Sequence, residues 1–141
     1  MRFGQHETPA DLQNESAVGR AIEQGFNCVL HKLPKSYRLD FMATRMNKPV
    51  AWIEVKCRKH ASTKYPTLML SLSKYMEAKR LEAQTYLPSY LVARFTDCIK
   101  FCPFAMGGDL RWGGRTKNTR DSRDIEPVLH FPIDRMENLE Q

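Results

Sequence analysis

Residues 51–57 constrain the fold most, because they read as a strand with charged side chains on one face only. Side chains along a strand alternate between the two faces of a sheet, so Glu54 and Lys56 point one way while Ile53 and Val55 point the other way. Such a strand is either the solvated face of an antiparallel sheet or one wall of a charged site. The residues that precede it help to decide between these two interpretations.

Asp40 lies in an apolar run over residues 37–44, which predicts a strand with Asp40 in its middle. The connection over residues 46–49 has turn-forming residues, so the strands on either side of it should form a hairpin. The hairpin would bring the carboxylates of Asp40 and Glu54 together beside the ammonium of Lys56. Two carboxylates can hold a hard divalent cation, and a neighbouring lysine can position or deprotonate a water molecule.

The order of the predicted elements is α-β-β-β-α-β, followed by further strands. This order predicts an α/β (α+β) fold in which helices flank a mixed central sheet. Two prolines in the last extended segment favour a place at a sheet edge. We expect helices over residues 9–24 and 71–85, strands over residues 26–33, 37–44, 50–58, 90–95, 98–104 and 125–133, and loops over residues 61–70 and 105–124.

The chain length of 141 residues predicts a single domain, with a core over about residues 11–104 and an extension over residues 105–141. No apolar run approaches the roughly 20 residues that cross a bilayer, and the first residues do not resemble a signal peptide. We therefore expect no membrane association and a cytoplasmic location, which is the host cytoplasm if the protein is viral. The formal net charge of +6 favours a polyanionic partner.

Basic residues gather at two places in the sequence, and these are candidate contacts for a nucleic-acid backbone. The first place is the end of the strand that carries Glu54. The second is a glycine-containing segment over residues 111–123, which could instead be a solvated surface loop. The four cysteines contain no C-x-x-C pair, so we expect free thiols and no zinc site. The candidate basic residues are Arg58, Lys59, Arg111, Arg115, Lys117, Arg120 and Arg123.

Each predicted helix carries one candidate residue. Glu15 borders the apolar face formed by Val18 and Ile22, so it could add a third carboxylate to the site. Lys74 lies in the first turn of the second helix, where a cation is unfavourable next to the helix dipole. Lys74 is therefore either a solvated lysine or a residue with a role near the site or its nucleic acid.

These residues together resemble the PD-(D/E)XK nuclease superfamily over about residues 11–102. The sequence is similar to small members such as Holliday junction resolvase-like and phage-type nucleases. Asp40 matches the superfamily Asp, although Leu39 stands where many members carry Pro. Glu54-Val55-Lys56 matches the (D/E)-x-K motif, and Glu15 matches a metal-site Glu on the leading helix of the resolvases.

The resemblance implies a restriction-endonuclease-like core and a Mg²⁺-dependent deoxyribonuclease, with Mn²⁺ as a substitute. Asp40, Glu54, the Val55 carbonyl and Glu15 would hold the metal, and Lys56 would orient the attacking water. A small basic nuclease with no recognition domain has little apparatus for base readout, so it should select DNA structures such as junctions, flaps, nicks or ends. Junction resolution would need a symmetric homodimer. RNA as the substrate and a non-catalytic nucleic-acid-binding protein on the same fold remain alternatives.

Overall fold

The computed structural model describes residues 9–114 and 125–140, with side chains for residues 16–113 and 125–140. Two helices, nine strands and three short 3-10 helices lie in this part of the chain. They are α1 (Pro9–Phe26), β1 (Val29–Lys32), η1 (Lys35–Tyr37), β2 (Phe41–Arg45), β3 (Lys48–Cys57), β4 (Thr67–Ser71), α2 (Leu72–Thr85), β5 (Ser89–Arg94), β6 (Ile99–Pro103), η2 (Phe104–Met106), β7 (Asp109–Gly114), β8 (Ile125–Pro132), η4 (Ile133–Arg135) and β9 (Glu137–Asn138).

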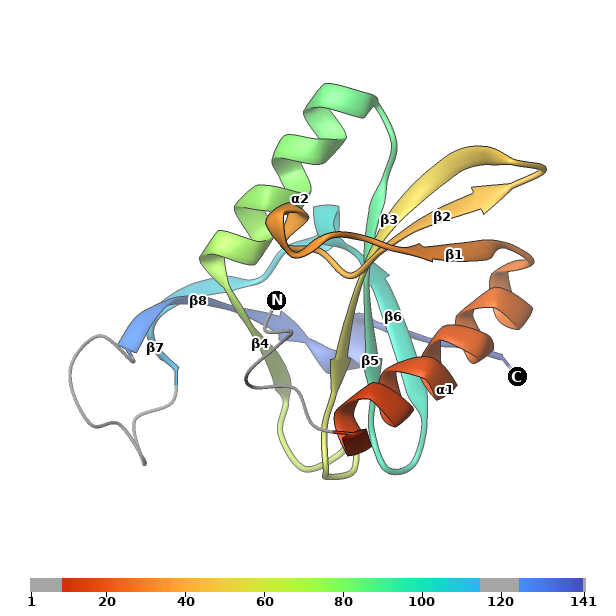
Figure 1. Cartoon of the computed structure of the whole chain (residues 1–141). Helices are drawn as coiled ribbons and strands as arrows, with labels where there is room; N and C mark the ends of the chain where they lie inside the picture. The colour runs from red at the N-terminus through yellow and green to blue at the C-terminus, as the bar shows by residue number, and fades with distance from the viewer. Residues whose placement is uncertain (1–8, 115–124, 141) are drawn as a thin grey trace.

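The central sheet has six strands in the order β1-β2-β3-β5-β6-β9. Strands β3 and β5 are parallel, and the other neighbours are antiparallel. A parallel pair needs a long crossover connection, which β4 and α2 supply here. This arrangement confirms the predicted mixed sheet flanked by helices, and Figure 1 shows α1 and α2 on its two sides.

The two faces of β3 bury different side chains. Ile53 belongs to a cluster with Val18 and Ile22 of α1. Trp52 belongs to a second cluster, which contains side chains from α2, β4 and β8. Because strand side chains alternate, Glu54 lies on the same face as Trp52 and points toward the α2 side of the sheet.

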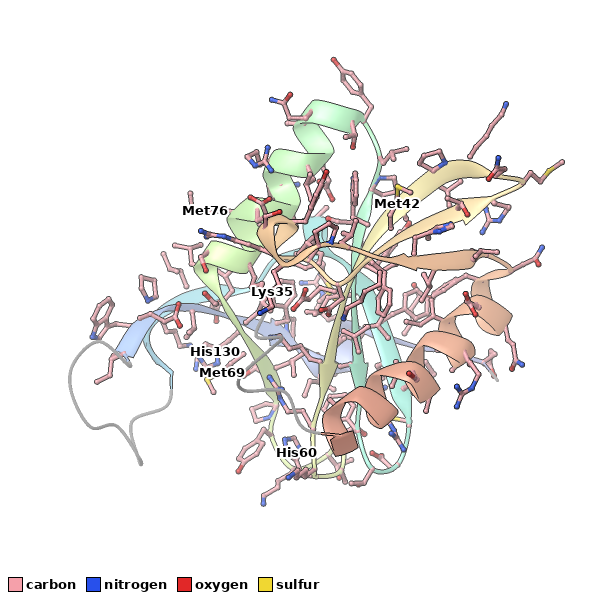
Figure 2. All side chains as sticks on the ribbon, in the orientation of Figure 1. Lys35, Met42, His60, Met69, Met76 and His130 are labelled. Carbon is pink, nitrogen blue, oxygen red and sulfur yellow. The ribbon has the colours of Figure 1, made fainter. Side chains whose placement is uncertain are left out.

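A second sheet has three antiparallel strands in the order β4-β8-β7. Its inner face contributes Leu70 and Leu129 to the core on the α2 side. On its outer face Met69 lies opposite His130 in the register, and Figure 2 labels both residues there. Figure 1 shows β7 and β8 extending together past the first turn of α2.

This second sheet corrects two predicted loops and one predicted edge. Residues 61–70 contain β4, and residues 105–124 contain β7. Strand β8 is the central strand of its sheet rather than an edge strand. Its prolines are tolerated because Pro127 pairs only with β7 and Pro132 pairs only with β4. Within the described residues, no helix is long and apolar enough to cross a membrane.

Gly108, which precedes β7, tests how closely the second sheet is packed. A Cβ atom there would lie 2.3 Å from the backbone oxygen of His130, whereas one at Gly19 in α1 would meet only Leu30 Cδ1 at 3.8 Å. We expect Gly108→Ala to lower the free energy of unfolding by roughly 2 kcal/mol or more, since backbone must move. Gly19→Ala should raise it by about 0.5–1 kcal/mol, because alanine is the better helix former.

Thermal unfolding of both variants measures these effects. A change of 1 kcal/mol corresponds to roughly 2–4 °C in a domain of this size. A Gly108→Ala variant that melts with the native protein would contradict the close approach of β7 to β8.

Candidate active site

Asp40 is held next to β3 by two hydrogen bonds. Its backbone amide donates to the Ile53 carbonyl at 3.2 Å, and its Oδ2 accepts from the Val55 amide at 2.8 Å. The side chain is buried. The structure therefore brings Asp40 to the Glu-x-Lys strand, as the sequence predicts.

The backbone around Asp40 differs from the prediction. Asp40 lies in a bend before β2 and not in the middle of a strand. The reason is the 3-10 helix η1, which ends at Arg38 in the left-handed conformation, with φ of 63°. The chain therefore enters the sheet only at Phe41, and the Asp40 side chain is directed by its hydrogen bond to Val55 rather than by strand alternation.

Glu54 is the most deeply buried acidic residue of the site, with 2% exposure. It lies on β3 between the partner strands β2 and β5, opposite Leu91 in the parallel register. Its Oε2 lies 3.5 Å from Lys56 Nζ and 3.4 Å from Lys74 Nζ. Its Oε1 is buried and has no hydrogen-bond partner among the described residues.

Lys74 reaches the site from the start of α2. Ser71 caps this helix by accepting a hydrogen bond from the Ser73 amide at 3.2 Å, and Lys74 follows in the first turn. The Lys74 ammonium donates to the Arg38 carbonyl and contacts Glu54, and its side chain is only 15% exposed. The interpretation of Lys74 as a solvated lysine is therefore wrong, because Glu54 and Arg38 offset its unfavourable place at the helix start.

Burial shifts the pKa values of the two central groups in opposite directions. The pKa of Glu54 is raised to about 7, first by burial and then by the negative charge of Asp40, although Lys56 and Lys74 act in the opposite sense. Burial also lowers the pKa of Lys56, although the Glu54 carboxylate opposes this change. Both shifts bring these groups closer to proton exchange near neutral pH, as is common at functional sites.

Asp40 and Glu54, with the Val55 carbonyl, are the candidate groups to hold a divalent cation. The buried and unpartnered Glu54 Oε1 supports this fit, since a buried carboxylate oxygen without a partner is costly. No cluster of three or more His, Cys, Asp or Glu side chains occurs in the described ranges. Glu15 belongs to α1, but its side chain lies outside the described part, so its role as a third ligand stays a prediction.

The structure describes only some of the basic residues that the sequence suggests for binding nucleic acid. The Arg58 guanidinium bonds to the carbonyls of Cys57 and Met69 at 3.3 and 3.4 Å, and Lys59 is exposed. Arg111 is exposed on β7 beside Asp109. Arg115, Lys117, Arg120 and Arg123 lie outside the described residues. No disulfide links the four cysteines, all of which are described.

Sequence reasoning missed two backbone groups that build the site. The Val55 amide orients Asp40, and the Arg38 carbonyl holds Lys74. Neither role has a signal in the residue types, because backbone donors and acceptors are common to nearly all residues. The contact of Lys74 with Glu54 likewise depends on where α2 packs.

The raised pKa of Glu54 predicts how stability depends on pH. Between about pH 4.5, the ordinary value, and about pH 7, the folded protein retains a proton that the unfolded chain has lost. The free energy of unfolding therefore falls as pH rises through this window, by up to about 3 kcal/mol. Glu54→Gln removes this titration, so its stability relative to the native protein should rise across the window and level off above it.

Urea unfolding of both proteins at several pH values between 4.5 and 8, without divalent cations, measures this difference. A difference in unfolding free energy that stays constant over this range would contradict the raised pKa of Glu54.

A comparison with solved structures finds a protein of similar fold. A structure of Hjc, a Holliday junction resolvase from the archaeal hyperthermophile Archaeoglobus fulgidus, is similar in fold, with a TM-score of 0.58 and 16% sequence identity. The similarity covers 86% of this chain and 82% of that one. A search of the curated proteins found no match.

The resemblance seen in the sequence is confirmed by a family model. The model of the family described as "Phage putative PDDEXK endonuclease" matches residues 1–139, so the chain belongs to this family of phage endonucleases.

Proposed function

We propose that this protein is a divalent-metal-dependent DNA endonuclease that selects its substrate by structure. The observation that carries the proposal is the pair of buried carboxylates, Asp40 and Glu54. Two lysines contact one Glu54 oxygen, and the other has no hydrogen-bond partner within the part of the chain that the structure describes. A charged set of this kind inside an apolar core is expensive, so its retention points to chemistry rather than to stability.

Asp40 and Glu54, with the Val55 carbonyl, would hold Mg²⁺ or Mn²⁺, and Glu15 is a further candidate ligand. The bound cation would supply Lewis-acid polarisation of a phosphoryl oxygen. Lys56 would orient the attacking water and stabilise the charge that develops on the phosphate. Water attacks phosphorus, the bond to the 3′ oxygen breaks, and the products carry a 5′-phosphate and a 3′-hydroxyl.

The net charge of the chain suggests the class of substrate. The chain carries a net charge of +6 and so suits a polyanion, and phosphate contacts by themselves carry no sequence information. Structure-selective cleavage of junctions, flaps, nicks or ends is therefore the proposed activity, and the resolvase-like fold is consistent with it. Cleavage of a four-way junction would require a symmetric homodimer, since two strands must be cut.

Asp40→Asn separates metal binding from folding. An asparagine Oδ1 can still accept the hydrogen bond from the Val55 amide, so the fold should survive, but the carboxylate charge is lost. We expect DNA cleavage to be abolished and the midpoint of unfolding without metal to change little. Mg²⁺ or Mn²⁺ at 100 times Kd should raise the free energy of unfolding of the native protein by about 2.7 kcal/mol and so raise its melting temperature. It should not raise the melting temperature of the variant.

Cleavage that persists in Asp40→Asn would remove Asp40 from the site. A thermal shift that is equal in the two proteins would place the metal elsewhere in the molecule.

A substrate panel tests the activity itself. The panel contains a four-way junction, a flap, linear duplex, single-stranded DNA and RNA, each with Mg²⁺ or Mn²⁺. Lys56→Ala should lower kcat by roughly 10²–10⁴-fold, the usual range for a positioned acid or base. Lys48→Ala is the matched control, because Lys48 is an exposed lysine at the β2–β3 turn, and it should cleave as the native protein does.

The pattern of cleavage across the panel distinguishes the alternatives. Cutting of DNA only, lost in Lys56→Ala, supports the proposal, and the best substrate names the subclass. Binding that weakens steeply with salt but never leads to cleavage supports the non-catalytic nucleic-acid-binding protein instead.

A further inference from the structure

Trp112 on β7 is a large apolar side chain exposed to solvent. Its exposure is 73%, and Leu110 on the same strand is 61% exposed. The other tryptophan of the chain, Trp52, is buried and donates a hydrogen bond from its Nε1 to Thr85 Oγ1 at 3.0 Å. An exposed indole forgoes the stabilisation that burial would bring, so its position needs an explanation.

The register shows which way Trp112 faces. Leu110 pairs with Leu129, which pairs with Leu70, and both of these partners are buried in the core on the α2 side. Trp112 lies two positions beyond Leu110 and therefore on the same face. It continues the inner, apolar face of the second sheet to the part of β7 that extends past α2 (Figure 1).

This face packs toward the layer that carries the candidate active site, since Leu70 and Leu129 share a core cluster with Trp52, which lies on the same face of β3 as Glu54. Arg111, the neighbour of Trp112, is in register with Val128 and Ser71, and Ser71 caps α2 one turn before Lys74. Ser71 Oγ also donates to Glu126 Oε1 at 2.7 Å, which ties β8 to this helix start. Two strand spacings from Arg111 to Ser71 and one helical turn from Ser71 to Lys74 add up to about 15 Å at most, so the backbone next to Trp112 lies within about four base steps of Lys74 along a DNA strand.

The charge of the chain favours a nucleic acid over a second copy at this face. Arg111, next to Trp112 on β7, is 53% exposed, and its ion pair with Asp109 is long, at 3.5 Å, and solvent-accessible. The whole chain carries a formal net charge of +6. Two copies of the chain would therefore repel each other, whereas a polyanion is attracted.

We propose that Trp112 stacks on an unpaired base of the DNA substrate, on the strand that reaches the Asp40–Glu54 site. The inference rests on the proposed function and narrows its substrate class to DNA with exposed bases close to the cleaved phosphate, such as single strands, flaps or open junctions. Stacking of this kind tolerates any base, because every base presents a π face. Leu110 extends the apolar surface beside the stacked base.

Tryptophan fluorescence tests the proposal directly, because only two tryptophans are present and one is buried. The measurements use the full chain with Asp40→Asn, so that cleavage does not interfere. Titration with a single-stranded oligonucleotide should quench the emission. The same titration of Asp40→Asn with Trp112→Phe should leave the remaining Trp52 emission unchanged while binding is retained, since phenylalanine can also stack.

Affinity provides the second readout. Trp112→Ala should weaken binding of single-stranded DNA by on the order of tenfold or more and change binding of blunt duplex by less than about twofold. Tyr86→Asn is the matched control, because Tyr86 is an exposed aromatic residue, 92% exposed, that follows the far end of α2. Asparagine also accepts the left-handed backbone at that position, so its affinity should match that of the parent.

Three results would overturn the proposal. They are emission that DNA does not quench, equal loss of affinity for duplex and single strand in Trp112→Ala, and emission that changes with protein concentration alone, which would mean that a second copy covers Trp112. These outcomes are independent of catalysis. Cleavage that is normal in Trp112→Ala and lost in Asp40→Asn would support the nuclease proposal and contradict the stacking role of Trp112. Binding that depends on Trp112 but is never followed by cleavage would support the stacking role and contradict the nuclease proposal.

Discussion

The burial of the Glu54 carboxylate is the constraint on which the rest of the site depends. A carboxylate in the centre of a sheet loses its hydration, and no single partner restores it. The protein offsets this cost with two ammonium groups on one oxygen, while the other oxygen is buried and finds no hydrogen-bond partner among the residues that the structure describes. Those two cations come from β3 itself and from α2, so the parallel crossover that connects β3 to β5 also supplies part of the charge balance.

The second sheet gives α2 its position. Leu70 and Phe131 pack with Ala78 and Leu81 of α2 in one cluster, so the helix lies between its own preceding strand and the central sheet. With the helix held there, its N-terminal cap at Ser71 directs Lys74 toward Glu54. Phe131 of β8, in the segment after residue 104, thus helps to hold the helix that carries a charged group of the site.

The sequence predicted the parts that depend on local pattern. Alternation placed Glu54 and Lys56 on one face, and the helix predicted over residues 71–85 matches α2. The alternating Thr67–Ser71 segment carried a strand signal that its surrounding turn residues obscured. The left-handed Arg38 that ends η1, the hydrogen bond that directs Asp40, and the approach of Lys74 to Glu54 are products of tertiary packing. No local propensity reports on them.

The charges of the site explain why two lysines are compatible with a cation. With both carboxylates ionised, Asp40 and Glu54 carry −2 and Lys56 and Lys74 carry +2, so the four groups together are neutral. A divalent cation on the carboxylates would leave an excess of +2, which complements an approaching phosphodiester and the further negative charge that develops when water attacks it. Because the pKa of Glu54 is raised to about 7, binding of the cation would displace one proton near neutral pH. The low-dielectric surroundings that make the ionised Glu54 costly would also strengthen its hold on the cation.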